Sequence, residues 1–491
     1  MIEIIYADIA IGAAENAAYS DTGHQEYSNI EHLSSGAGGK KIATGEVGRW
    51  SLDGTVDILN AVTADYGYIS ADQSNANGIY VGDVGIDVLF TTNFASSGLT
   101  ITFDTHEAVV YTVKTTWYNN DTIVREEIVD ASGEYIIEAA VDIYNKISVR
   151  FISSNMPYRF ARIEQLVFGV GRRFTPYDFE SVSLNQQVNP ISDDVGVDTS
   201  KFVLRNRKDN QYIFQTRQPF KIYKDGDLIS SHYLDTATLT NRDKYDISCQ
   251  SAIGVLDEQP FSAVMWFDKN AYEAAAEIVG DDFDVDMAEA LKNKKISGYI
   301  ADCTRREALH QLLFAIGAIC STNGTEKIRI YEYGIKAKQI PQENVYTGIK
   351  VKQSSVVTSV ELEYHEYSRT EIENAQKLDV DGVTYYHTTG IIVRNNPNII
   401  AGTKSNPKKV SGATLVTRKA AEEIFDAVYD YHINNAVVTE KIIITGEQPG
   451  DKVLTEDFAG KPFEGAIISR QTNLTNLFAS TIEVRGAYVT N

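Results

Sequence analysis

Phe220-Lys-Ile-Tyr-Lys-Asp-Gly-Asp227 is the stretch from which the fold of this 491-residue chain is most directly inferred. Its apolar residues alternate with polar ones, which is the period of a strand with one buried face. The dipeptide Asp225-Gly226 then interrupts the alternation, and this pair tolerates the positive φ angles of a two-residue hairpin turn. Alternation returns over residues 245–249. The sequence therefore predicts a β domain over residues 171–265.

The first 170 residues show the same period. From Val109 to Trp117 mostly apolar residues stand at every second position, and the turn-forming run 118–121 follows. The earlier part of this segment has small polar residues, and we expect aromatic residues such as Trp50 to anchor it. Short strands separated by Gly, Asn and Asp are typical of a β-sandwich. We expect this segment to end near the glycines of Gly169-Val-Gly171.

The middle of the chain changes to the helical period. Thr304 and Glu307 form the Thr-x-x-Glu pattern of a capping box. Apolar residues then recur at spacings of three and four as far as Ile319, and Gly324 is expected to end the unit. The sequence predicts a helix-bearing α+β domain over residues 266–345.

The last segment, 346–491, returns to β structure. A second Asp-Gly pair, Asp381-Gly382, predicts a hairpin, and the spacing of apolar residues predicts a helix from about Thr417 to Asn434. This segment and 171–265 are both strand-rich, which suggests a distant structural echo between them. The whole chain is therefore expected to be a multidomain, β-rich α+β protein of four parts.

Composition excludes several classes of function. Lys and Arg number 45 against 67 Asp and Glu, a net charge of −22, whereas nucleic-acid surfaces need clustered cations. No apolar run is long enough to span a bilayer, and the N-terminus lacks the pattern of a secretion signal. The three cysteines have no metal-ligand spacing. We expect a protein that folds in a reducing cytosol, without sequence-specific nucleic-acid binding.

No catalytic constellation stands out. His365-Glu366 lacks the second His of a zinc protease helix. Cys303 precedes a helix start, where a reactive thiolate would be favoured, but a structural thiol is the stronger interpretation. The acidic run 280–286 lacks the glycine and the closing Glu of an EF-hand. We therefore expect no enzyme activity, no catalytic residues, no metal and no cofactor.

Two short segments of the front sandwich are candidates for carbohydrate binding. Loop aromatics can stack on sugar rings while amides and guanidinium groups bond hydroxyls. The alternative is that Trp117 lies in the core at the end of an alternating strand. The candidate residues are Trp117, Tyr118, Asn119, Asn120, Tyr158 and Arg159.

A family resemblance is carried by short phrases spread over most of the chain. Between Phe174 and Phe261 they are Val188-Asn-Pro-Ile-Ser192, Phe202-Val-Leu-Arg-Asn206, Arg217-Gln-Pro-Phe-Lys-Ile-Tyr223, Tyr233-Leu-Asp235 and Ile253-Gly-Val-Leu-Asp257. This segment resembles the first tube-like domain of phage tail hub proteins. Further phrases are similar to the helix-bearing middle domain and the second tube-like domain of the same hubs: Arg306–Ala318, Gly446–Asp451, Phe463–Ser469 and Ile482–Gly486.

The front segment carries a second resemblance. Its phrases are Trp50-Ser-Leu-Asp-Gly54, Gly98-Leu-Thr-Ile-Thr-Phe103 and Pro157-Tyr-Arg-Phe-Ala-Arg-Ile-Glu164. They resemble a galactose-binding-like jelly roll, the front module of tail proteins from phages and tailocins of Gram-positive bacteria. No peptidase or lysozyme domain follows the hub portion, which argues against wall digestion by this chain.

The resemblance implies a protein made in the host cytoplasm, with a structural role in a virion or phage-tail-like particle, at the tail tip or baseplate. Such hubs are homotrimers in which two tube-like β-barrel domains per chain make a ring of six. That ring adapts a sixfold tail tube to a threefold tip and forms part of the channel. The implied partners are the tail tube or distal tail protein, baseplate or fibre proteins, a tip protein and, through the front module, host cell-wall glycan. Two alternatives remain open at this point, a cell-wall-degrading tail enzyme and a receptor-binding fibre subunit.

Overall fold

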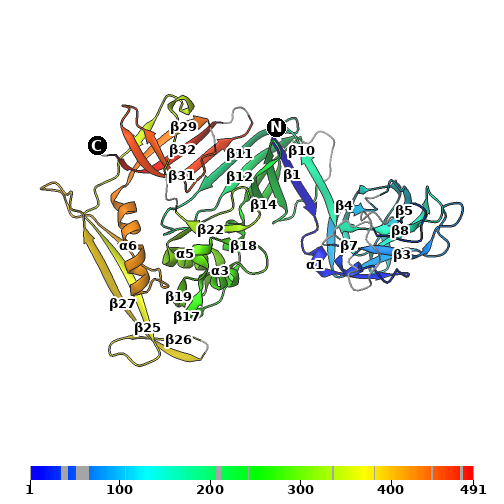
Figure 1. Cartoon of the computed structure of the whole chain (residues 1–491), viewed down its shortest axis with the longest axis horizontal. Helices are drawn as coiled ribbons and strands as arrows, with labels where there is room; N and C mark the ends of the chain where they lie inside the picture. Colours follow the sequence, from blue (N-terminus) through cyan, green and yellow to red (C-terminus); the bar gives the residue numbers. More distant parts are fainter. Residues whose placement is uncertain are drawn as a thin grey trace. The chain divides into compact units, whose positions relative to one another are not determined.

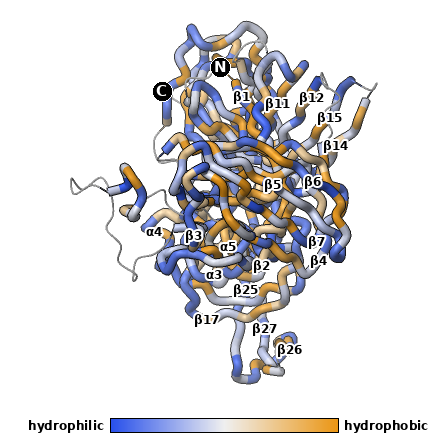
Figure 2. Tube along the Cα trace, turned by 90° about the vertical axis from the view of Figure 1, so that its right-hand side faces the viewer, coloured by the Kyte–Doolittle hydropathy of each residue, from blue (hydrophilic) through white to orange (hydrophobic). Residues whose placement is uncertain are grey.

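The computed structural model describes residues 2–34, 42–50, 66–104, 107–205, 212–240, 243–333, 337–380, 382–443, 446–475 and 479–489. Strands predominate over helices, with 54% of residues in strands and 13% in helices, which confirms the expected β-rich fold. Figure 2 shows hydrophobic and hydrophilic residues mixed along the strands, as expected where one face of a sheet is buried.

The chain divides into two compact units. Unit 1 comprises Met1–Ile4, Phe174–Asn206 and Phe220–Asn491, and unit 2 comprises Ile5–Arg173 and Arg207–Pro219. No sequence pattern predicted that the described residues 212–219 belong to unit 2. The finer division of unit 1 into 171–265, 266–345 and 346–491 stays a prediction.

Unit 2 contains the front sandwich. Its main sheet has the order β2-β4-β7-β5-β6, with β9 beside β4, and a separate pair joins β3 to β8. Tyr68 of β3 and Ile163 of β8 share one hydrophobic core with residues of the main sheet such as Trp117. The elements from the N-terminus to the end of unit 2 are β1 (Ile2–Ile9), α1 (Ala13–Asn16), β2 (Ala17–Asp21), η1 (Ile30–His32), β3 (Tyr68–Gln73), β4 (Gly85–Thr102), β5 (Tyr111–Asn119), β6 (Thr122–Ala131), β7 (Glu134–Ser154), β8 (Phe160–Ile163), β9 (Gln165–Val167) and β10 (Gly169–Phe174), the last crossing into unit 1 (Figure 1).

Unit 1 contains a large sheet, a small α+β region and a second four-stranded sheet. Its strands are β11 (Phe179–Gln187), β12 (Thr199–Arg205), β13 (Pro219–Lys224), β14 (Asp227–Thr240), β15 (Lys244–Gln250), β16 (Pro260–Phe261), β17 (Val264–Asn270), β18 (Val285–Met287), β19 (Lys295–Ile300), β20 (Cys303–Thr304), β21 (Ala318–Ser321), β22 (Ile328–Glu332), β23 (Lys338–Gln339), β24 (Lys350–Lys352), β25 (Ser359–Ser368), β26 (Gln376–Val380), β27 (Val383–Asn395), β28 (Pro407–Val410), β29 (Ala436–Ile443), β30 (Lys452–Glu456), β31 (Pro462–Asn473) and β32 (Ala479–Tyr488). Its helices are α2 (Ala252–Asp257), α3 (Ala271–Val279), α4 (Glu289–Lys292), α5 (Arg305–Ile316), η2 (Gln342–Asn344) and α6 (Arg418–Ile433).

The hairpin predicted at Asp225-Gly226 is confirmed. Both residues have positive φ angles, 54° and 95°, and they join β13 to β14. The large sheet continues from this hairpin in the order β13-β14-β15-β12-β11-β31-β32-β29-β24, with β30 also paired to β31. Strands from both ends of unit 1 therefore belong to one continuous sheet (Figure 1).

The two predicted helices form, and one of their predicted limits is wrong. Thr304 accepts from the backbone of Glu307 and completes the capping box of α5. The helix ends at Ile316, because Gly317 adopts a left-handed conformation with φ 64°, and Ile319 lies in the following strand. Helix α6 begins after Thr417 and ends before Asn434, as predicted.

The second sheet of unit 1 has the order β26-β27-β25-β28 and packs against α6. The Asp-Gly pair predicted to join its long hairpin is only partly visible, because Asp381 lies outside the described residues. Val360 and Leu362 of β25 share the core that contains Phe425 of α6. The apolar face of α6 is therefore buried chiefly by this sheet and by α5.

Buried carboxylates lie inside the large sheet. Glu440 of β29 is 2% exposed, and its Oε2 accepts from Thr455 Oγ1 at 2.9 Å. Its Oε1 has no hydrogen-bond partner among the described residues. Burial raises the pKa of Glu440 to about 7. In the folded state Glu440 is therefore mostly neutral below about pH 7.

This burial predicts a pH-dependent stability. Because the pKa of Glu440 is higher in the folded than in the unfolded state, protonation of Glu440 favours folding. This contribution to stability is present at low pH and is lost as the pH rises from about 4.5 to 7. Glu440→Gln, which stays neutral, should raise the free energy of unfolding by about 2–3 kcal/mol at pH 8 and change it little at pH 5. Thermal melts at both pH values are the measurement. Glu371→Gln on the exposed surface is the matched control, and an equal gain at pH 5 and pH 8 would contradict the prediction.

Candidate functional site

The large sheet of unit 1 repeats one arrangement of five strands. If the five strands of each half are numbered along the chain, their order across the sheet is 3-4-5-2-1 in both halves. All the neighbouring pairs whose register is known are antiparallel. The strands of the first half are β11, β12, β13, β14 and β15, and those of the second half are β24, β29, β30, β31 and β32.

A matching irregularity strengthens the correspondence. The fourth strand of each half has a bulge against the fifth, at Asp235 in β14 and at Ile468 in β31. After the bulge each strand continues for the same distance, as Thr236–Thr240 and as Ser469–Asn473. A bulge bends its strand and increases the local twist. Both halves therefore bend at the same point of the same strand.

The two halves are joined by one antiparallel ladder. Ser183–Gln187 of β11 pair with Ser469–Asn473 of β31. On the buried side of this ladder, Arg470 donates to Gln186 Oε1 from Nε at 2.9 Å and from Nη2 at 2.5 Å. Gln186 in turn donates to Asn323, and Arg470 also donates to the carbonyl of Glu447. The junction is thus a buried polar network in which Arg470 and Gln186 are hydrogen-bonded to one another and to neighbouring groups.

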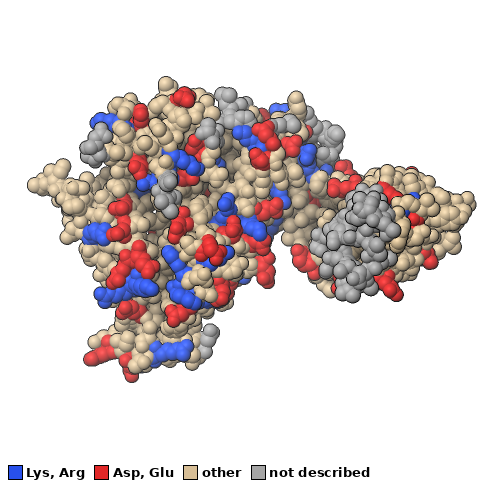
Figure 3. Space-filling model, in the orientation of Figure 1, with Lys and Arg blue, Asp and Glu red and all other residues tan. Residues whose placement is uncertain are grey.

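The opposite side of the same ladder is open and neutral. Its side chains are amides and hydroxyls, and they are exposed or half-buried. Charged groups such as Lys201, Asp246, Lys441 and Glu483 stand farther from the junction and have both signs. Over the visible face of unit 1, Figure 3 likewise shows positive and negative side chains intermingled. The neutral residues of the ladder are Ser183, Asn185, Gln187, Ser469, Gln471 and Asn473.

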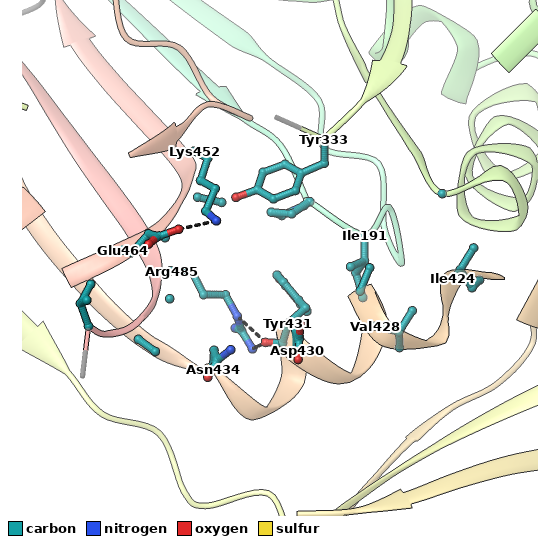
Figure 4. Close-up of a pocket in the computed structure, with 18 of the residues that line it drawn as sticks. Ile191, Tyr333, Ile424, Val428, Asp430, Tyr431, Asn434, Lys452, Glu464 and Arg485 are labelled. Carbon is teal, nitrogen blue, oxygen red and sulfur yellow. Dashed lines mark hydrogen bonds and ion pairs between the residues drawn. The ribbon is translucent and has the colours of Figure 1, made fainter. Parts of the chain in front are cut away.

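Beyond the ladder, helix α6 covers part of this open face and encloses a cavity of about 510 Å³ between itself and strands β30–β32 (Figure 4). The guanidinium of Arg485 lies 4.1 Å from the ring centroid of Tyr431 and donates to its carbonyl. Lys452 pairs with Glu464 on the facing strands. The labelled basic side chains of this cavity are therefore already held by groups of the cavity itself.

The perturbed titratable residues elsewhere in the described chain are a thiol and a pair of histidines. Burial raises the pKa of Cys303 to about 11, which disfavours a thiolate. His365 Nδ1 lies 2.9 Å from His387 Nε2, and burial lowers the pKa of His365 to about 4. The part of the chain that the structure describes holds no group of three or more His, Cys, Asp or Glu placed to bind a metal ion. No described helix is long and apolar enough to cross a membrane.

The carbohydrate candidates of the front sandwich fall into two separate places. Trp117 is fully buried in the core of unit 2, so its indole presents no face to a sugar. Tyr118, Asn119 and Asn120 stand at one end of β5, where Asn120 exchanges hydrogen bonds with Asn145. Tyr158 and Arg159 lie beyond the opposite end of β5. The first residue of β5, Tyr111, pairs with Ser154, the last residue of β7, and Tyr158 and Arg159 follow Ser154 in the chain. These residues therefore do not form one site.

The expectation that Trp50 anchors the front segment is wrong, because its side chain is largely exposed. Trp50 is 59% exposed and Tyr158 is 54% exposed. Glu107 joins their loops, because its Oε2 lies 3.1 Å from Arg49 Nε and 3.5 Å from Arg159 Nε. Residues 51–54 of the phrase that starts at Trp50 lie outside the described residues.

The same loops rest on buried ion pairs. Arg49 and Arg162 are each 1% exposed, and they pair with Asp104 and Glu46 respectively. Arg162 keeps its charge because the Glu46 carboxylate raises its pKa against the effect of burial. Two exposed aromatic rings are thus carried by loops that a charged core holds in place. An exposed Trp beside a buried Arg gives no periodic signal, so the sequence did not mark Trp50 as a candidate for binding.

Comparison with known proteins finds partial structural similarity at low sequence identity. No protein-family model and no curated protein matches the chain. A tail protein from Neisseria meningitidis is 12% identical, with a TM-score of 0.46, over 64% of this chain and 93% of its own. The prophage tail protein gp18 from Listeria monocytogenes is 12% identical, with a TM-score of 0.44, over 65% of this chain and 92% of its own. Discoidin II from Dictyostelium discoideum is 11% identical, with a TM-score of 0.20, over 49% of this chain and 90% of its own.

The contrast between the two tryptophans predicts different effects on stability. Trp117→Ala removes a fully buried ring and should destabilise unit 2 by about 3–5 kcal/mol. Trp50→Ala removes an exposed ring and should leave the thermal melt within about 0.5 kcal/mol of the parent. Parallel melts of both variants test this, and a large loss for Trp50→Ala would show that its ring packs inside the fold.

Proposed function

We propose that this chain is the structural hub of a phage tail or phage-tail-like particle, a homotrimeric ring that adapts a sixfold tail tube to a threefold tip. The observation that carries the proposal is the repeated five-strand arrangement within one continuous sheet. A chain with two similar ring elements supplies six when three copies close into a ring. The upper face of such a ring offers six equivalent positions to a sixfold tube, while the chains themselves remain threefold.

The open face of the large sheet suits a channel wall. Tight binding of DNA needs clustered Lys and Arg that displace counterions from phosphates. The ladder between the halves instead presents neutral amides and hydroxyls, with charges of both signs farther out. The chain as a whole carries a net charge of −22, but this face is neutral at its centre. DNA passing such a wall would meet few groups that hold it.

The partners follow from that position. We propose the tail tube or distal tail protein above the ring, baseplate or fibre proteins beside it and a tip protein below. The particle, at its tail tip or baseplate, is then the place where the chain acts, and the chain has no catalytic role there.

An accessory saccharide-binding role is favoured by one observation in unit 2. Trp50 and Tyr158 are both exposed and are carried by loops that share the Glu107 carboxylate. Exposed aromatic rings on fixed loops can stack on the apolar faces of sugar rings. The charged groups of this cluster pair with one another, which favours a neutral sugar of the host cell wall over a charged one.

The hub proposal predicts the mass and the place of the protein. Light scattering after size exclusion should give three times the 54.4 kDa of one chain. Electron microscopy of particles with this chain labelled should put the label at the tail tip, on the axis. A monomer in solution with label along peripheral fibres would overturn the hub proposal and support the receptor-binding fibre alternative.

The saccharide proposal predicts a loss of binding without a loss of fold. Trp50→Ala and Tyr158→Ala should each reduce retention on purified host cell wall by about tenfold, the effect of losing about 1.4 kcal/mol. Tyr118→Ala at the other end of β5 is the matched control and should bind as the parent does. Equal retention of all three variants would remove Trp50 and Tyr158 from the proposed site.

A further inference from the structure

Among the ten strands of the two halves, two strand edges have no strand partner in the described chain. In the sheet order β14 neighbours β13 and β15, but the hairpin at residues 225–226 limits β13 to the first part of β14. Thr236–Thr240 therefore pair on one side only, with β15, and most of these residues are exposed. At the other end of the sheet, β24 pairs with β29 and ends the order. Unpaired edges of this kind are ready templates for another strand.

The ladder inside the chain shows which strand fits each edge. It joins the first strand of one half, β11, to the fourth strand of the other, β31. The strands left with a free edge are the remaining first strand, β24, and the remaining fourth strand, β14. Within one chain a first strand pairs with a fourth strand, and the two strands that keep a free edge are again a first strand and a fourth strand.

The register follows from the residues that stand opposite one another. The row that begins just after the bulge runs Thr236, Ser248, Lys201, Ser183 in the first half and Ser469, Glu483, Thr439, Lys350 in the second. Ser183–Gln187 therefore correspond to Lys350–Ser354, and Ser469–Asn473 correspond to Thr236–Thr240.

We propose that Lys350–Ser354 of one copy pair antiparallel with Thr236–Thr240 of a second copy, with Lys352 opposite Thr238. The inference rests on the proposed hub function and names the contact that closes its ring. It transfers the register in which Asn185 stands opposite Gln471 within the chain. Because each copy gives a different edge to each neighbour, the contact is head-to-tail and generates a ring when the rotation closes.

The side chains of the two edges match across this register. Leu239, which is 52% exposed, comes opposite Val351, which already packs beside a core cluster. Leu239 and Val351 each lie on the core face of their own half, so pairing of the two edges would bury both side chains against each other. On the open face, Lys352 comes opposite Thr238, whose partner on β15 is Asp246. A lysine is thereby brought next to an acid of the second copy.

Cysteine pairs test the register in the full-length protein. Thr238→Cys with Lys352→Cys should give a covalent bond between copies on mild oxidation, since opposite residues in an antiparallel pair lie at disulfide distance. Asn185→Cys with Gln471→Cys is the positive control, because it must close within one chain. Thr238→Cys with Ser354→Cys is the off-register control, because diagonal neighbours are too far apart. The parent, with its three native cysteines, reports the background.

Charge reversal gives an independent readout. Lys352→Glu should weaken association between copies by about tenfold, and adding Asp246→Lys should restore it. Covalent oligomers from the in-register pair, together with this rescue, are the expected result. If the protein is a non-covalent trimer but forms only the off-register bond, the proposed contact is wrong and the hub function still stands. The same holds if no bond forms between copies while the positive control closes. A parent that stays monomeric without any bond between copies overturns both.

Discussion

The antiparallel ladder between β11 and β31 is the constraint on which unit 1 depends. It turns two five-strand halves into one sheet, and it buries Arg470 against Gln186 on the core side. An arginine inside a core is tolerated only when its donors are satisfied. Here Gln186 and the carbonyl of Glu447 accept from it, so the polar network fixes which residues of the two halves meet. The neutral open face exists only because the two halves are held in this register.

Local elements of the fold were predictable because their causes are local. Asp225-Gly226 forms a hairpin since only a few residue types accept two positive φ angles in succession. Thr304 begins a helix since its hydroxyl satisfies the backbone of Glu307. The end of that helix was misjudged because the apolar spacing continues through Ile319, while a left-handed glycine two residues earlier stops it.

Features that depend on distant partners were not predictable from one sequence. The pairing of residues 183–187 with residues 469–473 leaves no mark in either strand, because the alternation of each is the same with any neighbour. The similarity of the two halves, which the sequence suggested only through their shared richness in strands, resides in strand order and bulge position, not in residue identity. At the front module, burial separates Trp117 from Trp50, and burial follows from packing that composition does not reveal.

The long sequence separation within the ladder has a consequence for synthesis. Gln186 and Arg470 are 284 residues apart, so β11 emerges from the ribosome long before the strand that covers its edge. Contacts between such distant segments form late and slowly. During translation the nascent chain therefore carries an open edge that its own C-terminal part must later close. Chains released early would lack that cover, so the ladder also selects complete chains for assembly.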